Sequence, residues 1–156
     1  MLAKKIAITA PYSGSGKTTA SIGIMEALIR RGLSVQPFKV GPDYIDPAFH
    51  RRVTGRPSIN LDSWLIDENY IKNMFIRYGK DSDISVIEGV MGFYDGYGTE
   101  NIYRGSTAGI CKLLGTPPVL VMDAHGMAAT AAAIVKGIFE LGDFDRGGVI
   151  INKASS

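Results

Sequence analysis

An eight-residue segment, Pro11-Tyr12-Ser13-Gly14-Ser15-Gly16-Lys17-Thr18, constrains the fold more than any other part of the sequence. It follows a short β-branched run at 5–10 and opens a segment of helical period at 18–31. Glycines in such a segment let backbone N–H groups turn inward around phosphate oxygens, and the N-terminus of the helix adds partial positive charge. The segment therefore predicts a loop that binds the phosphates of a nucleoside triphosphate, with ATP as the expected nucleotide.

The polar residues of this loop have expected partners. Lys17 is expected to bridge the β- and γ-phosphates, and the Thr18 hydroxyl to ligate Mg²⁺. Pro11 departs from the pattern G-x-x-x-x-G-K-[ST], whose first position is glycine. A glycine-rich turn with a chance Gly-Lys-Thr fits less well, because a strand precedes the segment and a helix follows it. The residues expected to contact the nucleotide are Ser13, Gly14, Ser15, Gly16, Lys17, Thr18 and Thr19.

Short apolar runs alternate with longer segments of helical period along the chain. This alternation predicts an α/β fold in which a mainly parallel sheet is flanked by helices. Together with the phosphate loop it predicts a P-loop NTPase. Residues 41–64 break the pattern, since they are polar and aromatic without a clear period, and we expect a long functional loop there. The expected strands are 5–10, 34–40, 84–88, 119–123 and 148–151, and the expected helices are 18–31, 67–78, 106–114 and 127–141.

The composition narrows the function. The 156 residues suit a single domain, and a net charge of +2 without a basic block indicates neither a nucleic-acid partner nor a membrane surface. No apolar run approaches the roughly 20 residues that span a bilayer. The single cysteine, Cys111, argues against a disulfide and against a cysteine zinc cluster. We therefore expect a soluble cytoplasmic protein.

Carboxylates follow the strands expected beside the phosphate loop. Glu88 ends the run 84–88, where a buried charge is costly unless it is paired or binds a metal. Asp43 and Asp46 follow the run 34–40, and Asp95 lies in the glycine-rich turn at 92–96. Mg²⁺ prefers such oxygen ligands. Capping of a turn or helix is the alternative for Asp43 and Asp46, and simple turn formation is the alternative for Asp95.

Lys39 stands at the end of the second expected strand. Ligands of open α/β sheets bind beyond the carboxyl ends of the strands, so this lysine is expected to lie beside the phosphates. A solvated lysine at a strand end is the alternative.

With these residues in place, the chain resembles the cobyrinic acid a,c-diamide synthases and their relatives that amidate nickel sirohydrochlorin for coenzyme F430. It is also similar to, but distinct from, cobyric acid synthase and dethiobiotin synthetase, so a dethiobiotin-synthetase-like fold is implied. Pro11 matches this family. The resemblance covers nearly the whole chain and rests on the segments 10–19, 39–47 with 49–50, 60–62 with 64–65, 88–92 with 94–96, and 105–108.

The resemblance implies an ATP-dependent carbon–nitrogen ligase. ATP and Mg²⁺ would convert a side-chain carboxylate of a tetrapyrrole into an acyl phosphate. Ammonia, released from glutamine by a glutaminase domain or subunit, would then displace the phosphate and leave an amide. The resemblance leaves open whether the ring is cobyrinic acid or nickel sirohydrochlorin.

The resemblance also implies residue roles. Asp43 and Glu88 would join Thr18 at the metal, and Asn152 would contact adenine. Lys17, Lys39, Asp46 and Asp95 would be catalytic, and Tyr44, Asp46, Tyr94 and Asp95 would meet the substrate. Tyr44, Phe49, Trp64, Phe93 and Tyr94 are either contacts to a flat macrocycle or residues of the core.

Residues 1–156 are expected to form the ATP-binding synthetase domain, cut short at its C-terminus and without the glutaminase domain. Dimerisation is left open. The alternative function is a nucleotide-switched ATPase of the partitioning or metal-insertion type, but Tyr12 stands where those proteins usually carry a second lysine. A module that binds nucleotide without chemistry is a third hypothesis.

Overall fold

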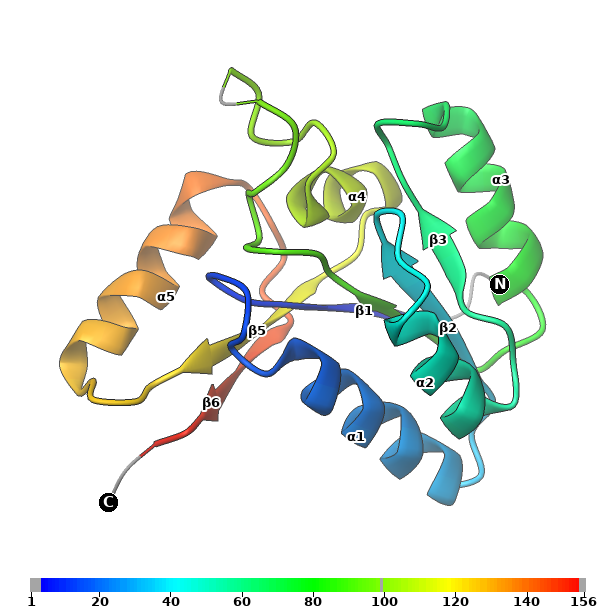
Figure 1. Ribbon diagram of the computed structural model, residues 1–156, viewed down its shortest axis with the longest axis horizontal. Helices are drawn as coiled ribbons and strands as arrows, with labels where there is room; N and C mark the ends of the chain where they lie inside the picture. Colours follow the sequence, from blue (N-terminus) through cyan, green and yellow to red (C-terminus); the bar gives the residue numbers. More distant parts are fainter. Residues whose placement is uncertain (1–3, 99, 155–156) are drawn as a thin grey trace.

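The computed structural model describes residues 4–98 and 100–154, which form a six-stranded parallel sheet between two layers of helices (Figure 1). The strand order is β3-β2-β4-β1-β5-β6, and every neighbouring pair is parallel. The predicted fold class is confirmed. The elements are β1 Lys4–Thr9, α1 Lys17–Arg30, β2 Val35–Val40, α2 Asp46–Thr54, β3 Ile59–Leu61, α3 Glu68–Gly79, β4 Ile84–Glu88, α4 Thr107–Leu114, β5 Pro118–Asp123, α5 Ala129–Leu141 and β6 Gly148–Asn152.

Alternate residues of the central strands feed two separate cores. Ala7 and Ile87 face the core beneath α3, α4 and α5, whereas Ile8 and Val86 face the core beneath α1 and α2. Figure 1 shows these two layers on opposite sides of the sheet. Strands buried on both faces read as continuous apolar runs, which is why 84–88 and 119–123 were recognisable from sequence.

The expectation of one long loop at 41–64 is wrong, because this segment contains α2 and β3. The only buried side chain of α2 is the polar His50, so the helix carries no apolar stripe. Strand β3 has three residues and pairs with β2 alone. Both elements owe their structure to tertiary contacts that a period search does not detect.

The strand order brings the predicted site residues to one edge. β4 lies between β1 and β2, with Ile8 and Lys39 both in register with Glu88. The segments after these strands therefore meet at the carboxyl edge of the sheet, as expected for a ligand site. Within residues 4–98 and 100–154, every helix falls short of the length and apolarity that crossing a bilayer requires.

Candidate active site

The phosphate loop joins β1 to α1 and is shaped by two glycines. Gly14 has φ 84° and Gly16 has φ 103°, a left-handed conformation that strains other residues. A side chain on Gly16 would also collide with the amide of Asn152. The buried Ser15 hydroxyl donates to the Tyr12 carbonyl at 2.9 Å, which closes the turn. Helix α1 begins at Lys17, so its first N–H groups face the loop.

Asn152 ends β6 and packs against this loop. Its Nδ2 donates to the Ser15 carbonyl at 2.9 Å, and its Oδ1 accepts from the Lys153 backbone at 3.0 Å. The Lys153 ammonium lies 2.7 Å from Asp123 Oδ2 and 3.3 Å from the Gly14 carbonyl. The structure thus brings Asn152 to the phosphate loop, and its contact to adenine stays a prediction.

Lys17 is nearly buried and lies across the loop. Its Nζ donates to the Met91 carbonyl at 2.6 Å and to the Tyr12 carbonyl at 3.4 Å. Met91 has φ 46°, and backbone strain in a residue other than glycine is typical of functional sites. Burial and the nearby charge of Lys39 lower the pKa of Lys17. The lysine is therefore a cation short of counter-charge, which suits it to phosphate.

Glu88 is 1% exposed and connects the loop to α2. Its Oε1 accepts from Thr18 Oγ1 at 2.7 Å, and its Oε2 accepts from His50 Nε2 at 2.6 Å. His50 is fully buried, and its Nδ1 is hydrogen-bonded to Ser58 Oγ at 3.0 Å. Burial alone would raise the pKa of Glu88, but the hydrogen bonds from His50 and Thr18 outweigh it and hold the pKa below its usual range.

Lys39 lies at the centre of a charged cluster that it forms with Asp43 and Asp46. Its buried Nζ donates to the Gly89 carbonyl at 3.0 Å and lies 3.5 Å from both Asp43 Oδ2 and Asp46 Oδ2. The alternative of a solvated lysine is therefore excluded. Asp43 also closes the turn that precedes α2, since its Oδ1 accepts from the backbone N–H groups of Ile45 and Asp46 at 2.8 and 3.3 Å. Asp43 therefore caps a turn, which was one alternative, and also lies beside Lys39.

The two aspartates carry opposite pKa shifts. Burial and the negative charge of Glu88 raise the pKa of Asp46 to about 6. Burial also acts on Asp43, but the backbone N–H of Ile45 and the charge of Lys39 outweigh it and lower the pKa of that carboxyl. Carboxylates that crowd together in this way repel one another unless cations lie between them.

The oxygen donors at this edge fit a magnesium ion. Within the described residues no three His, Cys, Asp or Glu side chains form a ready-made metal cage. Mg²⁺ needs no such cage, because it keeps several waters and binds through one or two carboxylates and phosphates. The Thr18 hydroxyl and the Glu88 carboxylate, 2.7 Å apart, are the donors that would hold it, and Asp43 lies on the same edge.

Asp95 closes the turn that follows β4. Its Oδ2 accepts from the Gly92 N–H at 3.0 Å, so the turn interpretation is correct for one oxygen. A side chain on Gly92 would collide with the Pro11 carbonyl, which shows how closely this turn approaches the phosphate loop. The charge of Asp95 also reaches Lys17. Asp95 therefore lies close to the phosphate loop, and its catalytic and substrate roles stay predictions.

The two tyrosines expected to meet the substrate lie in different surroundings. The Tyr94 hydroxyl donates to the Ile138 carbonyl of α5 at 2.7 Å, and burial raises the pKa of Tyr94 to about 12. Phe93 is buried beside it, so these two rings pack with the core. Tyr44 is 85% exposed at the carboxyl edge. Its contact with substrate stays a prediction. Ser13 and Thr19 are exposed on the loop and on α1.

Sequence reasoning missed His50 and the Met91 carbonyl. His50 belonged to a segment that supported the resemblance, but the absence of an apolar period hid the helix that carries it.

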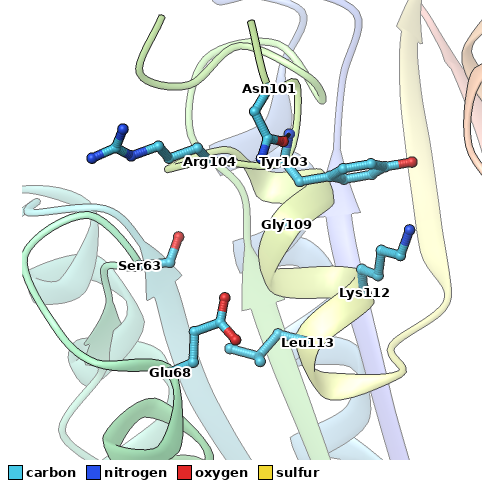
Figure 2. Close-up of a pocket in the computed structure, with 8 residues that line it drawn as sticks. All are labelled: Ser63, Glu68, Asn101, Tyr103, Arg104, Gly109, Lys112 and Leu113. Carbon is cyan, nitrogen blue, oxygen red and sulfur yellow. Dashed lines mark hydrogen bonds between the residues drawn. The ribbon is translucent and has the colours of Figure 1, made fainter.

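A separate cavity of about 360 Å³ lies beside α4, and within the described residues none of the predicted site residues lines it (Figure 2). It is bordered by Ser63, Glu68, Asn101, Tyr103, Arg104, Gly109, Lys112 and Leu113.

A model of a known protein family covers almost the whole chain. Residues 6–156 match the model of the CobQ/CobB/MinD/ParA nucleotide binding domain. The chain belongs to this family. Membership identifies a nucleotide-binding domain, so the phosphate loop is its nucleotide site.

The closer relatives of this nucleotide-binding domain share one name. Cobyrinate a,c-diamide synthase of Listeria innocua is 51% identical over 97% of this chain and 34% of that protein. Its counterpart in Picrophilus torridus is 52% identical over 100% of this chain and 35% of that protein. The resemblance to cobyrinic acid a,c-diamide synthases is thereby confirmed. The chain spans about a third of the length of these curated relatives.

Solved structures confirm the fold alone. The signal recognition particle receptor FtsY of Elizabethkingia anophelis superposes with a TM-score of 0.67 at 14% identity, over 95% of this chain and 49% of that one. A DUF1611 family protein of Anabaena variabilis gives a TM-score of 0.58 at 17% identity, over 97% of this chain and 46% of that one.

Proposed function

We propose that this domain activates a side-chain carboxylate of cobyrinic acid for amidation, using ATP and Mg²⁺. The substrate carboxylate attacks the γ-phosphorus, the bond to the β,γ-bridging oxygen breaks, and ADP leaves. Ammonia then attacks the acyl carbon of the acyl phosphate, and inorganic phosphate leaves. A glutaminase domain in the remaining two thirds of a full-length protein would release that ammonia from glutamine. Names shared by relatives at about 50% identity support this substrate over nickel sirohydrochlorin.

One observation carries the proposal. Two buried lysines, Lys17 and Lys39, and the carboxylates of Asp43, Asp46 and Glu88 converge at the open end of a phosphate loop. Transfer of phosphate to a carboxylate brings two anions together, so fixed cations are needed between them. A carboxylate is already ionised at neutral pH, so the site needs no strong base.

Different residues of this chain would hold the phosphates, the metal and the substrate carboxylate. The loop N–H groups and Lys17 hold the phosphates, while Thr18, Glu88 and Asp43 would hold Mg²⁺, which supplies charge neutralisation when bound. Lys39 places its ammonium between Asp43 and Asp46. It is positioned to neutralise the incoming substrate carboxylate.

The test is mass detection of amidated product from full-length protein supplied with ATP, Mg²⁺, glutamine and cobyrinic acid. Glu88→Gln and Asp43→Asn should each abolish Mg²⁺-dependent turnover, whereas Glu140→Gln, an exposed position on α5, should leave it unchanged. Absence of product from cobyrinic acid and from nickel sirohydrochlorin, with nucleotide binding intact, would contradict the proposal. Full activity in Glu88→Gln would contradict the metal role.

A nucleotide-switched ATPase is the second candidate, because a nucleotide-binding domain is by itself compatible with it. The exposed Tyr12 stands at the loop position where a second lysine would reach a partner subunit. The same assay decides, because a switch ATPase would hydrolyse ATP without amidating a carboxylate.

A further inference from the structure

A small apolar cavity opens beside the phosphate-transfer site. It has a volume of about 210 Å³ and lies at the ends of β3, β2 and β4. Its apolar walls are Pro42, Trp64, Val90, Met91 and Tyr97, with the buried Asp62 among them. None of these residues has a role in the phosphate chemistry through its side chain.

An aromatic pair forms the outer wall of this cavity. The rings of Trp64 and Tyr97 stack with centroids 4.1 Å apart and planes 22° from parallel. Trp64 is 52% exposed and Tyr97 is 49% exposed, so large apolar ring surface faces solvent beside the cavity. Exposed apolar surface gathered in one place marks a binding site more often than scattered residues do.

The pair is held in place by its own backbone. The Asp62 Oδ1 accepts from the Trp64 N–H at 2.9 Å, which fixes the start of one segment. The Tyr97 N–H donates to the Arg104 carbonyl at 2.9 Å, which closes the other. Hydrogen bonds thus hold both backbone segments that carry the rings, and the two stacked rings form an aromatic platform.

A cation lies on the same platform. The Arg104 guanidinium carbon is 5.4 Å from the Tyr97 ring centroid, and within the described residues Arg104 forms no ion pair. Figure 2 shows its side chain extending away from Tyr103 and Lys112. An exposed arginine stacked on an aromatic ring keeps its donors free for a carboxylate.

The cavity shares its walls with the phosphate site. The carbonyl of Met91 accepts from Lys17, and Pro42 lies in the segment between Lys39 and Asp43. A ligand on the platform therefore lies next to the lysines that hold the transferred phosphate.

We propose that the Trp64–Tyr97 platform binds the ring of the tetrapyrrole substrate, with apolar groups of its rim in the cavity and a side-chain carboxylate on Arg104. This assignment rests on the proposed function. The cavity is too small for the macrocycle and takes only groups from its edge. The substrate class that fits is a flat, apolar ring bearing several carboxylates.

The charge of the cavity sets the orientation of the ring. Asp62 is 6% exposed, and its Oδ2 has no hydrogen-bond partner within the described residues. An anionic side chain inserted into the cavity would lie close to this acidic residue of the wall, whose Oδ2 is itself closed off from solvent, and would be repelled. Methyl groups of the rim therefore enter the cavity, while carboxylates point toward Arg104 and toward Lys39.

The test measures cobyrinic acid binding by calorimetry, with Mg²⁺ and a non-hydrolysable ATP analogue present. Trp64→Ala and Tyr97→Ala should each weaken binding about tenfold, as expected for loss of a stacking ring. Arg104→Ala should weaken it several-fold, more at low salt than at high salt. Trp64 is the single tryptophan of the 156 residues, so its fluorescence reports ring contact directly.

Matched controls come from the opposite edge of the sheet. Arg77 lies over the Tyr78 ring at 5.8 Å, near the end of α3, and Tyr78→Ala and Arg77→Ala should leave binding unchanged. Trp64→Phe keeps a ring and should keep most of the affinity even where Trp64→Ala perturbs folding. Nucleotide affinity should be equal in all variants.

Two results would overturn the assignment, and only one of them would also overturn the proposed function. If the wild-type chain binds the nucleotide analogue but not cobyrinic acid, the substrate of the proposed function fails and the platform fails with it. If the wild-type chain binds cobyrinic acid and Trp64→Ala and Tyr97→Ala bind it equally well, the platform alone fails and the proposed function stands.

Discussion

Asp83 at the amino edge of the sheet and the pair Lys17 and Asp46 at the carboxyl edge lie in opposite electrostatic surroundings. At the amino edge, the Asp83 carboxylate accepts from both the backbone N–H and the hydroxyl of Ser34, each at 2.7 Å, and these bonds lower the pKa of Asp83. At the carboxyl edge, burial and the charge of Lys39 lower the pKa of Lys17, while burial and Glu88 raise that of Asp46. Hydrogen bonds favour the charged form of Asp83, whereas the surroundings of Lys17 and Asp46 disfavour theirs.

This difference separates structure from function within one sheet. Hydrogen bonds that favour the charged form of a group stabilise the fold, whereas like charges brought together destabilise it and persist where a ligand compensates them. Substitutions at the carboxyl edge should therefore cost binding more than stability. Substitutions at the amino edge should do the reverse.

The largest expected effect is at Lys17. Lys17→Met should weaken binding of ATP with Mg²⁺ by about 100-fold, because a charged donor aimed at the phosphates is lost. The free energy of unfolding should stay the same or rise, since a buried charge is removed. Calorimetry and urea unfolding measure both, with the exposed Lys72→Met as control. Equal nucleotide affinity in the two variants would contradict the role of Lys17.

His50 is the exception that sharpens the comparison, because it lies at the carboxyl edge and yet holds the structure together. His50→Ala should lower the free energy of unfolding by roughly 3 kcal/mol, through a lost hydrogen bond to a buried carboxylate and a cavity. His50→Gln keeps a donor and should recover part of the loss. The exposed Arg51→Ala on the same helix is the control, and a His50→Ala variant as stable as this control would refute the expectation.

Asp46 provides a pH test of the unfavourable charge surroundings at the carboxyl edge of the sheet. Its pKa of about 6 in the folded chain exceeds the ordinary value of 3.8, so the folded state holds the proton more tightly than the unfolded state. The contribution of Asp46 to stability should therefore decline as pH rises from about 4 to about 6. Asp46→Asn should remove this decline. Urea unfolding between pH 4 and 7 measures it, and parallel curves for the two proteins would count against the raised pKa.

The smallest expected effect is at Asp83. Its pKa is lowered, so its contribution to stability is present above the ordinary value of 3.8 and is lost as pH falls through the folded pKa. Asp83→Asn should lower the melting temperature slightly at pH 7, with a gap from wild type that closes at acid pH, and should leave nucleotide affinity unchanged. The neighbouring Asp81→Asn is the control. A gap that widens in acid would reverse the assignment.

Local signals explain which parts of the fold and site were predictable. The phosphate loop is built from backbone atoms of consecutive residues, so its glycines and its Lys17-Thr18 pair are visible in the sequence. The strands next to it are apolar on both faces and stand out equally well. Helix α2 is different, since its one buried side chain, His50, is polar and satisfied by Glu88, 38 residues away.

The phosphate loop, the parallel sheet and the placement of Asp43 and Glu88 after strands could be read from the sequence alone. Strand-loop-helix order and the carboxyl ends of strands dictate them locally. The tertiary structure decided the partners of each charge: Glu88 with Thr18 and His50, and Lys39 with Asp43 and Asp46. It also turned Tyr94 toward α5 and stacked Trp64 on Tyr97. Such contacts join residues far apart in the chain, and only packing chooses among them.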